Sequence, residues 1–247
     1  MMTPDEHRRM AACEDTLWHY AALHGHVRRA LARSGARIDG AWLDAGCGTG
    51  GLLRRLRRWF PAATLRGIEF SAFAVALARE RTNGAVDEGS LLALPYADAS
   101  FDVVTCVDVV YQFEEPAAAY REAARCLRPG GVLVVNEPAH RWLYSYHDVS
   151  VGGRWRFTRA ELRDLLRAAG LEPVYATHWN FLPLPLVWAR RKFLPAPQGS
   201  DVGEYPWWVA GPMRVLMALE RAWLAGGGRF PCGVSVLMAA RRPTDRG

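Results

Sequence analysis

The segment LDAGCGTG, residues 43–50, decides the fold of this 247-residue chain. It follows a short apolar run at residues 41–44 and precedes residues 51–60, in which leucine and arginine side chains alternate at helical spacing. Glycine allows the backbone to turn sharply and to approach a ligand closely, and the first amides of a following helix can bind polar groups. The segment therefore predicts a strand, a ligand-binding loop and a helix.

Strand and helix patterns continue to alternate after this loop. Residues 72–81 and 116–127 have helical spacing, and the second of these helices is expected to stop at Pro129, with Gly130 as its left-handed cap. Apolar, β-rich runs indicate strands at residues 64–69, 101–106, 132–136, 171–177 and 233–240. This alternation predicts parallel β-α-β units in a doubly wound α/β sheet.

The chain is expected to form a single domain with two additions to its core. Residues 1–40 form a helical leader, in which residues 13–33 carry apolar side chains at helical spacing. The core comprises residues 41–180 and 231–242. Between its last two strands, residues 181–230 are rich in Pro, Trp and Leu and are expected to form a cap or interaction insertion.

The glycine loop alone fits two classes of ligand. Gly46, Gly48 and Gly51 match the G-x-G-x-x-G pattern of dinucleotide sites. Asp44 argues against that ligand, because a carboxylate here would repel a pyrophosphate and would attract the ammonium group of a methionine moiety. Glu69, at the end of the second predicted strand, can accept hydrogen bonds from ribose hydroxyls in either class.

Four motifs in order extend this argument: LDAGCGTG at 43–50, GIEFS at 67–71, LPYADASFDVV at 94–104 and LRPGG at 127–131. Together they resemble class I S-adenosylmethionine-dependent methyltransferases of the methyltransferase type 11 group, over about residues 42–136. The resemblance implies a Rossmann-like, seven-stranded sheet whose last strand is antiparallel. The residues 233–240 fit that last strand.

The resemblance also implies which residues hold S-adenosylmethionine. Asp44 and the loop would hold its methionine part, Glu69 its ribose, and Ser90 with Leu91 its adenine edge, although Ser90 stands where many relatives have Asp. The complete expected set of cofactor-binding residues is Asp44, Gly46, Cys47, Gly48, Gly50, Glu69, Phe70, Ser90, Leu91, Val107 and Gln112.

Candidate acceptor-side residues follow the later strands. His147 is the expected general base, because it stands beside Asp148 in the loop after the strand predicted at residues 132–136, and Tyr111 is expected to face the acceptor. The alternative for His147 is a hydrogen bond to a loop carbonyl, and for Tyr111 it is core packing. The expected substrate-binding residues are Tyr20, His140 and Tyr144.

The composition limits which kinds of partner the chain is expected to bind. The formal charge of +6 comes from arginines scattered along the chain, which does not favour a nucleic-acid partner. The five cysteines lack the spacing of a metal site, and residues 1–10 are too polar for a secretory signal, so a cytoplasmic protein without a bound metal is expected.

The insertion at 181–230 is expected to cap the pocket or to form a homodimer contact. Peripheral membrane contact is the less favoured alternative, because prolines would interrupt a long amphipathic helix there.

These expectations converge on methyl transfer to an O or N atom of a small acceptor that is apolar or aromatic. Two alternatives stay open: a nicotinamide-dependent oxidoreductase, and a non-catalytic cofactor-binding scaffold that acts through the insertion. Asp44 and the absence of a Tyr-x-x-x-Lys pair in the sequence argue against the oxidoreductase.

Overall fold

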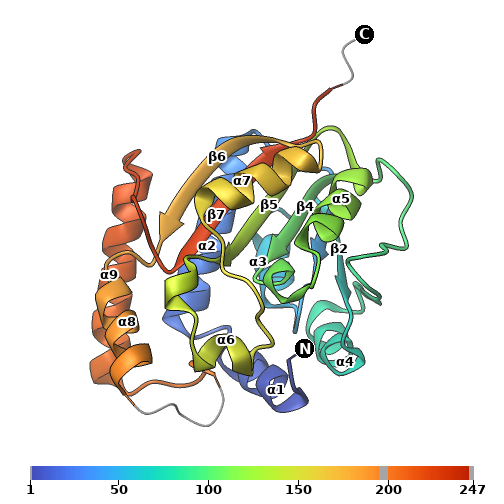
Figure 1. Cartoon of the computed structure of the whole chain (residues 1–247). Coiled ribbons are helices and arrows are strands. Elements are labelled where there is room, and N and C mark those ends of the chain that lie inside the picture. The colour runs from blue at the N-terminus through green and yellow to red at the C-terminus, as the bar shows by residue number, and fades with distance from the viewer. Residues whose placement is uncertain (1, 195–199, 245–247) are drawn as a thin grey trace.

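A seven-stranded sheet, in the order β3-β2-β1-β4-β5-β7-β6, forms the centre of the computed structural model (Figure 1). The structure describes residues 2–194 and 200–244. All neighbouring strands are parallel except β7, which is antiparallel to both β5 and β6. The strands are β1 (Ala41–Ala45), β2 (Thr64–Glu69), β3 (Val86–Glu88), β4 (Phe101–Val107), β5 (Leu127–Pro138), β6 (Glu172–Trp179) and β7 (Ser235–Arg241). The predicted doubly wound sheet with an antiparallel last strand is confirmed.

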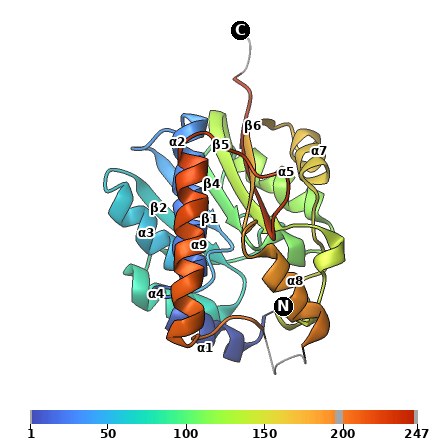
Figure 2. The ribbon, with the colours of Figure 1, turned by 90° about the vertical axis from the view of Figure 1, so that its left-hand side faces the viewer.

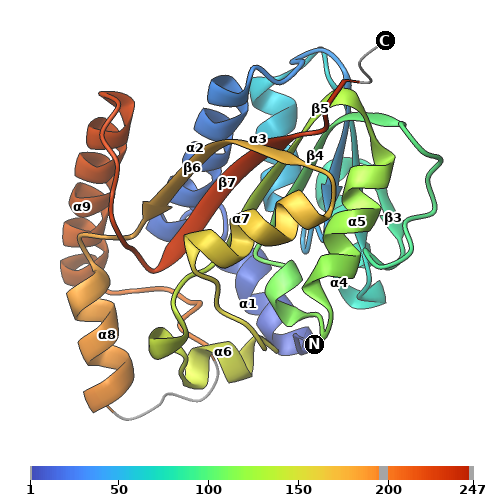
Figure 3. The ribbon, with the colours of Figure 1, turned by 45° about the horizontal axis from the view of Figure 1, so that its top comes forward.

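Helices cover both faces of this sheet (Figure 3). Apolar residues of α2, α3 and α4 pack on one face, and those of α5 and α7 pack on the other. The helices are α1 (Pro4–Cys13), α2 (Trp18–Ser34), α3 (Gly51–Trp59), α4 (Ala72–Thr82), α5 (Pro116–Cys126), α6 (Tyr146–Ser150), α7 (Arg159–Ala168), α8 (Leu184–Phe193) and α9 (Trp207–Ala225), with short 3-10 turns η1 (Val110–Gln112) and η2 (Arg141–Leu143).

The leader differs from its sequence-based expectation. The helix expected over residues 13–33 is α2, which begins only at Trp18, and a separate helix, α1, precedes it and ends at Cys13. Thr3 caps α1 by accepting a hydrogen bond from the Glu6 amide, and Pro4 occupies its first position. The leader thereby places α1 at the carboxyl ends of the strands and α2 on the sheet (Figure 1).

The predicted end of the helix at 116–127 is also wrong. Helix α5 ends at Cys126, and Leu127 is already extended and pairs with Phe101 of β4. Burial of Leu127 in the core favours this early start of the strand. Gly130 does have a left-handed conformation, at φ +79°, but it lies inside β5, where its amide bonds to the carbonyl of Arg242.

The insertion consists mainly of α8 and α9, and α9 contradicts the expectation that prolines interrupt a long helix. It runs for 19 residues through Pro212. An internal proline costs a helix about 3 kcal/mol, and the burial of Met213, Met217 and Leu224 offsets that cost. Within the described residues, no helix has both the length and the apolar character needed to cross a bilayer.

Candidate active site

A cavity of about 1090 Å³ opens at the carboxyl ends of the parallel strands. The order of the strands reverses between β1 and β4, which is where a doubly wound sheet places its ligands. The leader, the loops after β1, β2 and β4, and helices α8 and α9 all contribute to the wall. The volume slightly exceeds the usual range of ligand pockets, about 300–1,000 Å³, so there is room for two small ligands.

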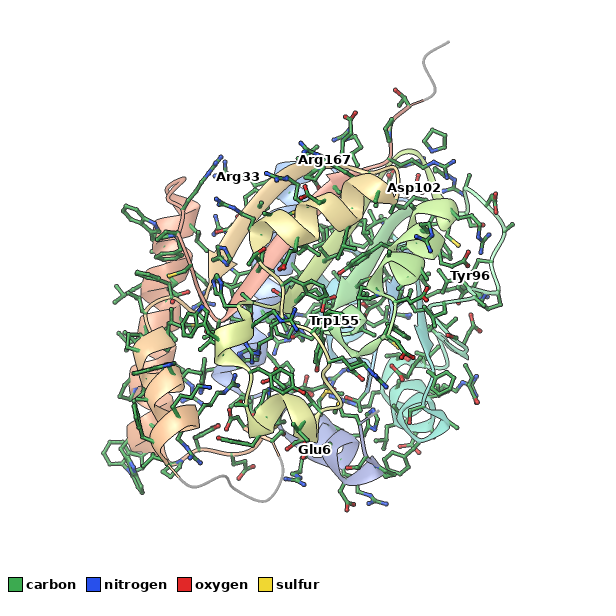
Figure 4. All side chains as sticks on the ribbon, in the orientation of Figure 1. Glu6, Arg33, Tyr96, Asp102, Trp155 and Arg167 are labelled. Carbon is green, nitrogen blue, oxygen red and sulfur yellow. The ribbon has the colours of Figure 1, made fainter. Side chains whose placement is uncertain are left out.

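Glu6 of the leader makes a buried contact with the insertion (Figure 4). Glu6 lies at the cavity end, where α1 approaches α6, whereas Asp102 lies at the far end of β4. The buried Glu6 carboxylate accepts hydrogen bonds from the Ser200 amide (3.1 Å) and hydroxyl (2.7 Å). This contact joins α1 to the segment that connects α8 and α9.

The glycine loop has the backbone that the sequence predicts. Gly46, Gly48 and Gly50 all have positive φ angles, of +77°, +53° and +84°. A Cβ atom on Gly46 would lie 2.4 Å from the Val109 side chain, and one on Gly48 would lie 2.8 Å from that of Met10. Only glycine fits such positions without a shift of its neighbours.

Asp44 presents an unsatisfied carboxylate oxygen beside this loop. Its Oδ1 accepts a hydrogen bond from the Thr105 hydroxyl (2.6 Å), whereas its buried Oδ2 has no partner in the structure. Burial raises the pKa of Asp44 to about 7. A buried acceptor without a partner costs free energy, and the ammonium group of a methionine moiety would both satisfy and ionise it. The site therefore fits the cofactor that the sequence indicated.

Glu69 lies opposite, at the end of β2. Its two oxygens accept hydrogen bonds from the amides of Gly48 (3.0 Å) and Ser71 (2.9 Å), which hold the carboxylate at the cavity wall. Each carboxylate oxygen can accept a second hydrogen bond. The arrangement leaves lone pairs for ribose hydroxyls.

The structure places most of the expected cofactor residues around the cavity, but not all of them. Three of the expected residues do not line the cavity: Gly50, Ser90 and Leu91. Ser90 accepts a hydrogen bond from the Leu92 amide, and Leu91 is buried in the core. Cys47 lines the cavity, and burial raises the pKa of its thiol. The expected residues that line the cavity are Asp44, Gly46, Cys47, Gly48, Glu69, Phe70, Val107 and Gln112.

The expected His147–Asp148 pair does not form. Asp148 has its carboxylate in a buried ion pair with Arg156 (2.8 Å) and in the cap of α6. His147 lines the cavity, and its Nδ1 accepts a hydrogen bond from the Asp201 amide (3.1 Å). Burial lowers the pKa of His147, and nearby Arg191 lowers it further. The neutral ring therefore carries its proton on Nε2 and acts as a hydrogen-bond donor there, which does not suit a general base.

Two of the three expected substrate residues also lie away from the cavity. Tyr20 lines it, together with its helix neighbours Trp18 and His19. His140 instead stacks against His178, with ring centres 5.2 Å apart, and the Tyr144 hydroxyl donates to the Gly153 carbonyl.

Tyr111 lines the cavity from η1, which is held firmly. The buried Glu137 carboxylate accepts hydrogen bonds from the amides of Val110 (3.2 Å) and Tyr111 (3.1 Å). The Trp155 indole, near the middle of Figure 4, donates to the Phe113 carbonyl at 2.8 Å. These bonds fix the turn that follows β4.

Asp108 is the site residue that the sequence analysis missed. It follows β4 directly, lines the cavity and has a left-handed backbone, with φ +52°. Its Oδ1 accepts a hydrogen bond from the Asn136 amide group (2.7 Å), and the Trp179 indole donates to the other end of that amide (2.7 Å). Burial raises the pKa of Asp108 to about 7. Strained residues and shifted carboxyl groups both concentrate at functional sites.

Glu14 is a second missed residue. It follows α1, lines the cavity and accepts a hydrogen bond from the Thr49 hydroxyl (2.7 Å), and it also pairs with Arg81. These contacts brace the glycine loop from the leader. Neither Asp108 nor Glu14 could be identified from the sequence, because the contacts of both depend on residues distant in the chain.

Comparisons with known proteins show methyltransferases as relatives of this chain. A family model described as "Methyltransferase domain" matches residues 43–135. The ubiquinone biosynthesis O-methyltransferase of Thiobacillus denitrificans is 32% identical over 166 residues, which cover 59% of this chain and 70% of the relative. The demethylmenaquinone methyltransferase of Roseiflexus sp. is 32% identical over 142 residues, which cover 56% and 58% of the two chains. Several relatives match over only about half of their length.

A structural comparison covers nearly the whole chain. The methyltransferase in a complex with a methyltransferase activator from Haloferax volcanii has a TM-score of 0.62 and 24% identity, over 96% of this chain and 98% of that one. This likeness shows the shared fold. With the four ordered motifs, the matched relatives and the cavity beside Asp44 and Glu69, the chain belongs to the class I S-adenosylmethionine-dependent methyltransferase family.

Proposed function

We propose that this chain transfers a methyl group from S-adenosylmethionine to an O or N atom of a small apolar or aromatic acceptor. The observation that carries the proposal is one cavity with different chemistry along its wall. Asp44 and Glu69 line the cofactor part, and Asp108 and Tyr111 follow the neighbouring strand β4. Apolar side chains from α8 and α9 complete the wall.

In the cofactor part, Asp44 would hold the ammonium group, Glu69 the ribose hydroxyls, and the loop around Gly46 and Gly48 would pass close to the ligand. When bound, S-adenosylmethionine supplies an electrophilic methyl group. Transfer of that group needs chiefly alignment of the acceptor and exclusion of water. A rigid wall suits this task, and Glu137 and Glu14 support it by fixing η1 and the glycine loop.

We assign the role of proton acceptor to Asp108 instead of His147. A carboxyl group with a pKa near 7 is well matched to accept a proton from a hydroxyl or protonated amine at neutral pH. Asn136 and Trp179 orient the carboxylate through the chain of hydrogen bonds described above. The Nε2 proton of His147 would then help to orient the acceptor as a donor.

The acceptor part favours an apolar, ring-shaped molecule. Tyr20, Phe113, Val109 and Met213 line the cavity, and aromatic and aliphatic walls bind apolar rings. One matched relative is named as a ubiquinone biosynthesis O-methyltransferase, and another as a demethylmenaquinone methyltransferase. Hydroxylated quinols and phenols with short alkyl chains are therefore the first acceptors to test.

Transfer of a labelled methyl group to such a panel tests the proposal. We expect turnover with at least one phenolic or quinolic acceptor, and a drop of about 10²–10⁴-fold in Asp108→Asn, the range typical for loss of a general base. Asp164→Asn is the matched control, because this exposed carboxylate lies on α7 and pairs only with its neighbour Arg163 among the contacts described. Full activity of Asp108→Asn would refute the base assignment. No turnover by the folded chain with the phenols and quinols, or with aromatic amines added to the panel, would refute the proposed class.

Two further expectations are also proposals: the division into leader, core and cap, and a cytoplasmic location. The cap is supported by Val187 and Val209, which line the cavity from the insertion. For the oxidoreductase and scaffold alternatives, the structure offers no specific supporting observation.

A further inference from the structure

Helix α9 has apolar residues on two opposite faces. One face, formed by Ala210, Met213, Met217 and Leu224, is buried against the rest of the chain. The other face carries Trp208, Val215, Leu219 and Trp223, which are 56–62% exposed. The spacing of these four residues places them on one stripe, about 22 Å long at 1.5 Å per residue. A helix that is apolar on both sides is ordinarily covered on both.

The exposed stripe faces outward along the side of the molecule. In Figure 2, α9 is the outermost element on this side and runs in front of α2. Nearby exposed aromatic residues enlarge the apolar area: Trp207 at the start of α9 is 81% exposed, and Phe193 at the end of α8 is 71% exposed. An exposed apolar stripe of this kind marks an interaction site.

The charges around the stripe select the kind of partner. Arg214 and Arg221 are exposed on α9, whose single carboxylate, Glu220, is 0% exposed and accepts hydrogen bonds from the amides of Asn180 and Leu182. The last turn of α8 adds the exposed Lys192, whereas Arg190 lies over the Tyr146 ring and Arg191 pairs with Asp201 and has only 7% of its side chain exposed. Tryptophan with flanking basic side chains is typical of helices that lie in the headgroup region of an anionic bilayer.

The same charges argue against a second copy of this chain as the partner. In a two-fold dimer the same patch meets itself, so the arginines at the flank of the stripe would be brought nearer to their own copies. Because Glu220 is buried, no carboxylate of the fully described helix α9 could pair with them.

We propose that the outer face of α8 and α9 docks on an anionic lipid surface. The proline argument against a membrane-associated helix no longer applies, because α9 continues through Pro212. Val209 and Met213 of α9 and Leu186 of α8 also line the cavity, so docking would bring its wall close to the lipid. Delivery of an apolar acceptor from the bilayer rests on the proposed function, whereas the docking itself does not.

Vesicle binding of the full chain tests the docking without any methyl donor. Flotation at low salt with vesicles of 30% phosphatidylglycerol in phosphatidylcholine should recover the chain, and flotation with pure phosphatidylcholine or at high salt should recover much less. Trp207→Ser with Trp208→Ser should weaken binding by more than about tenfold, because two large apolar contacts are lost. Ile38→Ser is the control, since Ile38 is 61% exposed before β1 at the opposite end of the strands.

A second pair of variants tests the charge. Each arginine near an anionic surface contributes about 1 kcal/mol, so Arg214→Gln with Arg221→Gln should weaken binding by about 30-fold. Arg163→Gln with Arg167→Gln removes the same charge from α7 and should have little effect, because α7 packs on the other face of the sheet from α9. Arg167 is labelled on that helix in Figure 4.

Binding of S-adenosylhomocysteine by each variant reports that it is folded, and it fails separately if the proposed cofactor is wrong. Circular dichroism then provides an independent check of folding. No flotation of the folded wild-type chain at low salt would overturn the docking proposal. Self-association that Trp207→Ser with Trp208→Ser abolishes, without vesicle binding, would overturn it in favour of a dimer interface.

Discussion

Asp44 leads to a quantitative prediction about proton release on cofactor binding. In the ligand-free chain its pKa is raised from about 3.8 to about 7 by burial, and Oδ2 has no partner. This rise in the pKa of Asp44 corresponds to about 4 kcal/mol in favour of the protonated form. At pH 6 about 0.9 of the Asp44 carboxyls are therefore protonated. An ammonium group bound at Oδ2 would favour the ionised form and expel that proton.

Calorimetric titration with S-adenosylhomocysteine measures this effect. The apparent enthalpy at pH 6, compared in two buffers of different ionisation enthalpy, should indicate release of about 0.9 proton per site, and the release should be nearly zero at pH 8.5. Asp44→Asn should bind at least about tenfold more weakly, because a hydrogen bond to a charged partner contributes about 1.5–3 kcal/mol. The variant should also lose the proton release.

Asp108→Asn is the matched control, because Asp108 has a similar pKa but lies outside the expected cofactor contacts. Its proton release should equal that of the wild-type chain. Tight binding without proton release, or equal release by Asp44→Asn, would refute the assignment of Asp44 to the ammonium group.

The same carboxyl affects stability. Because the folded state holds this proton more tightly than the unfolded state, the ligand-free chain loses stability as the pH rises from about 4 to 7, and the loss is complete above that window. The Asn variant keeps an acceptor for Thr105 and avoids the buried charge. At pH 8 its free energy of unfolding should exceed that of the wild-type chain by up to about 4 kcal/mol. Chemical denaturation measures the difference, and a less stable variant would contradict the reasoning.

Three other predictions concern the loop, the proposed base and the insertion. Gly46→Ala should lower the free energy of unfolding by more than about 2 kcal/mol and weaken cofactor binding, because the new Cβ meets Val109. Gly170→Ala is the control: its new Cβ would meet open space, so it should lower the free energy of unfolding by only about 1 kcal/mol. The value of kcat/KM should fall below about pH 7 as Asp108 becomes protonated, and a profile that stays flat between pH 5.5 and 8 would contradict its role. Glu220→Ala should lower the urea-unfolding free energy by about 2–5 kcal/mol, because it leaves buried amides without an acceptor, and an unchanged midpoint would contradict that contribution.

Local sequence signals predict the sheet well, because each strand is a buried run that ends at a turn. β2 was expected at residues 64–69 and occupies Thr64–Glu69. β3 was not predicted, because its three residues, Val86–Glu88, are too few to show the alternation of apolar and polar side chains that identifies a strand. The helix through Pro212 was missed for a different reason: the burial of its inner face outweighs the local preference against proline.

The cofactor part of the site was also accessible from the sequence, because the topology brings strand ends to one edge. Asp44 and Glu69 end neighbouring strands and line one cavity. The acceptor part was accessible only in part, because the expected Tyr20, Tyr111 and His147 do line the cavity but Asp108 was missed. His147 and Asp148 are adjacent on α6, so their side chains point about 100° apart and cannot serve one another. The environment of Asp108 depends on Asn136 and Trp179, whose positions only the folded sheet determines.

The most direct test of the central claim is a comparison of ligand binding by the purified chain. Titration with S-adenosylhomocysteine and with NAD, each followed by calorimetry at pH 7.5, distinguishes the two ligand classes that share a glycine loop. We predict that S-adenosylhomocysteine binds and that Glu69→Ala weakens this binding, while NAD binds far more weakly or gives no heat. A folded chain that binds NAD more tightly, or that binds no S-adenosylhomocysteine, would contradict the account.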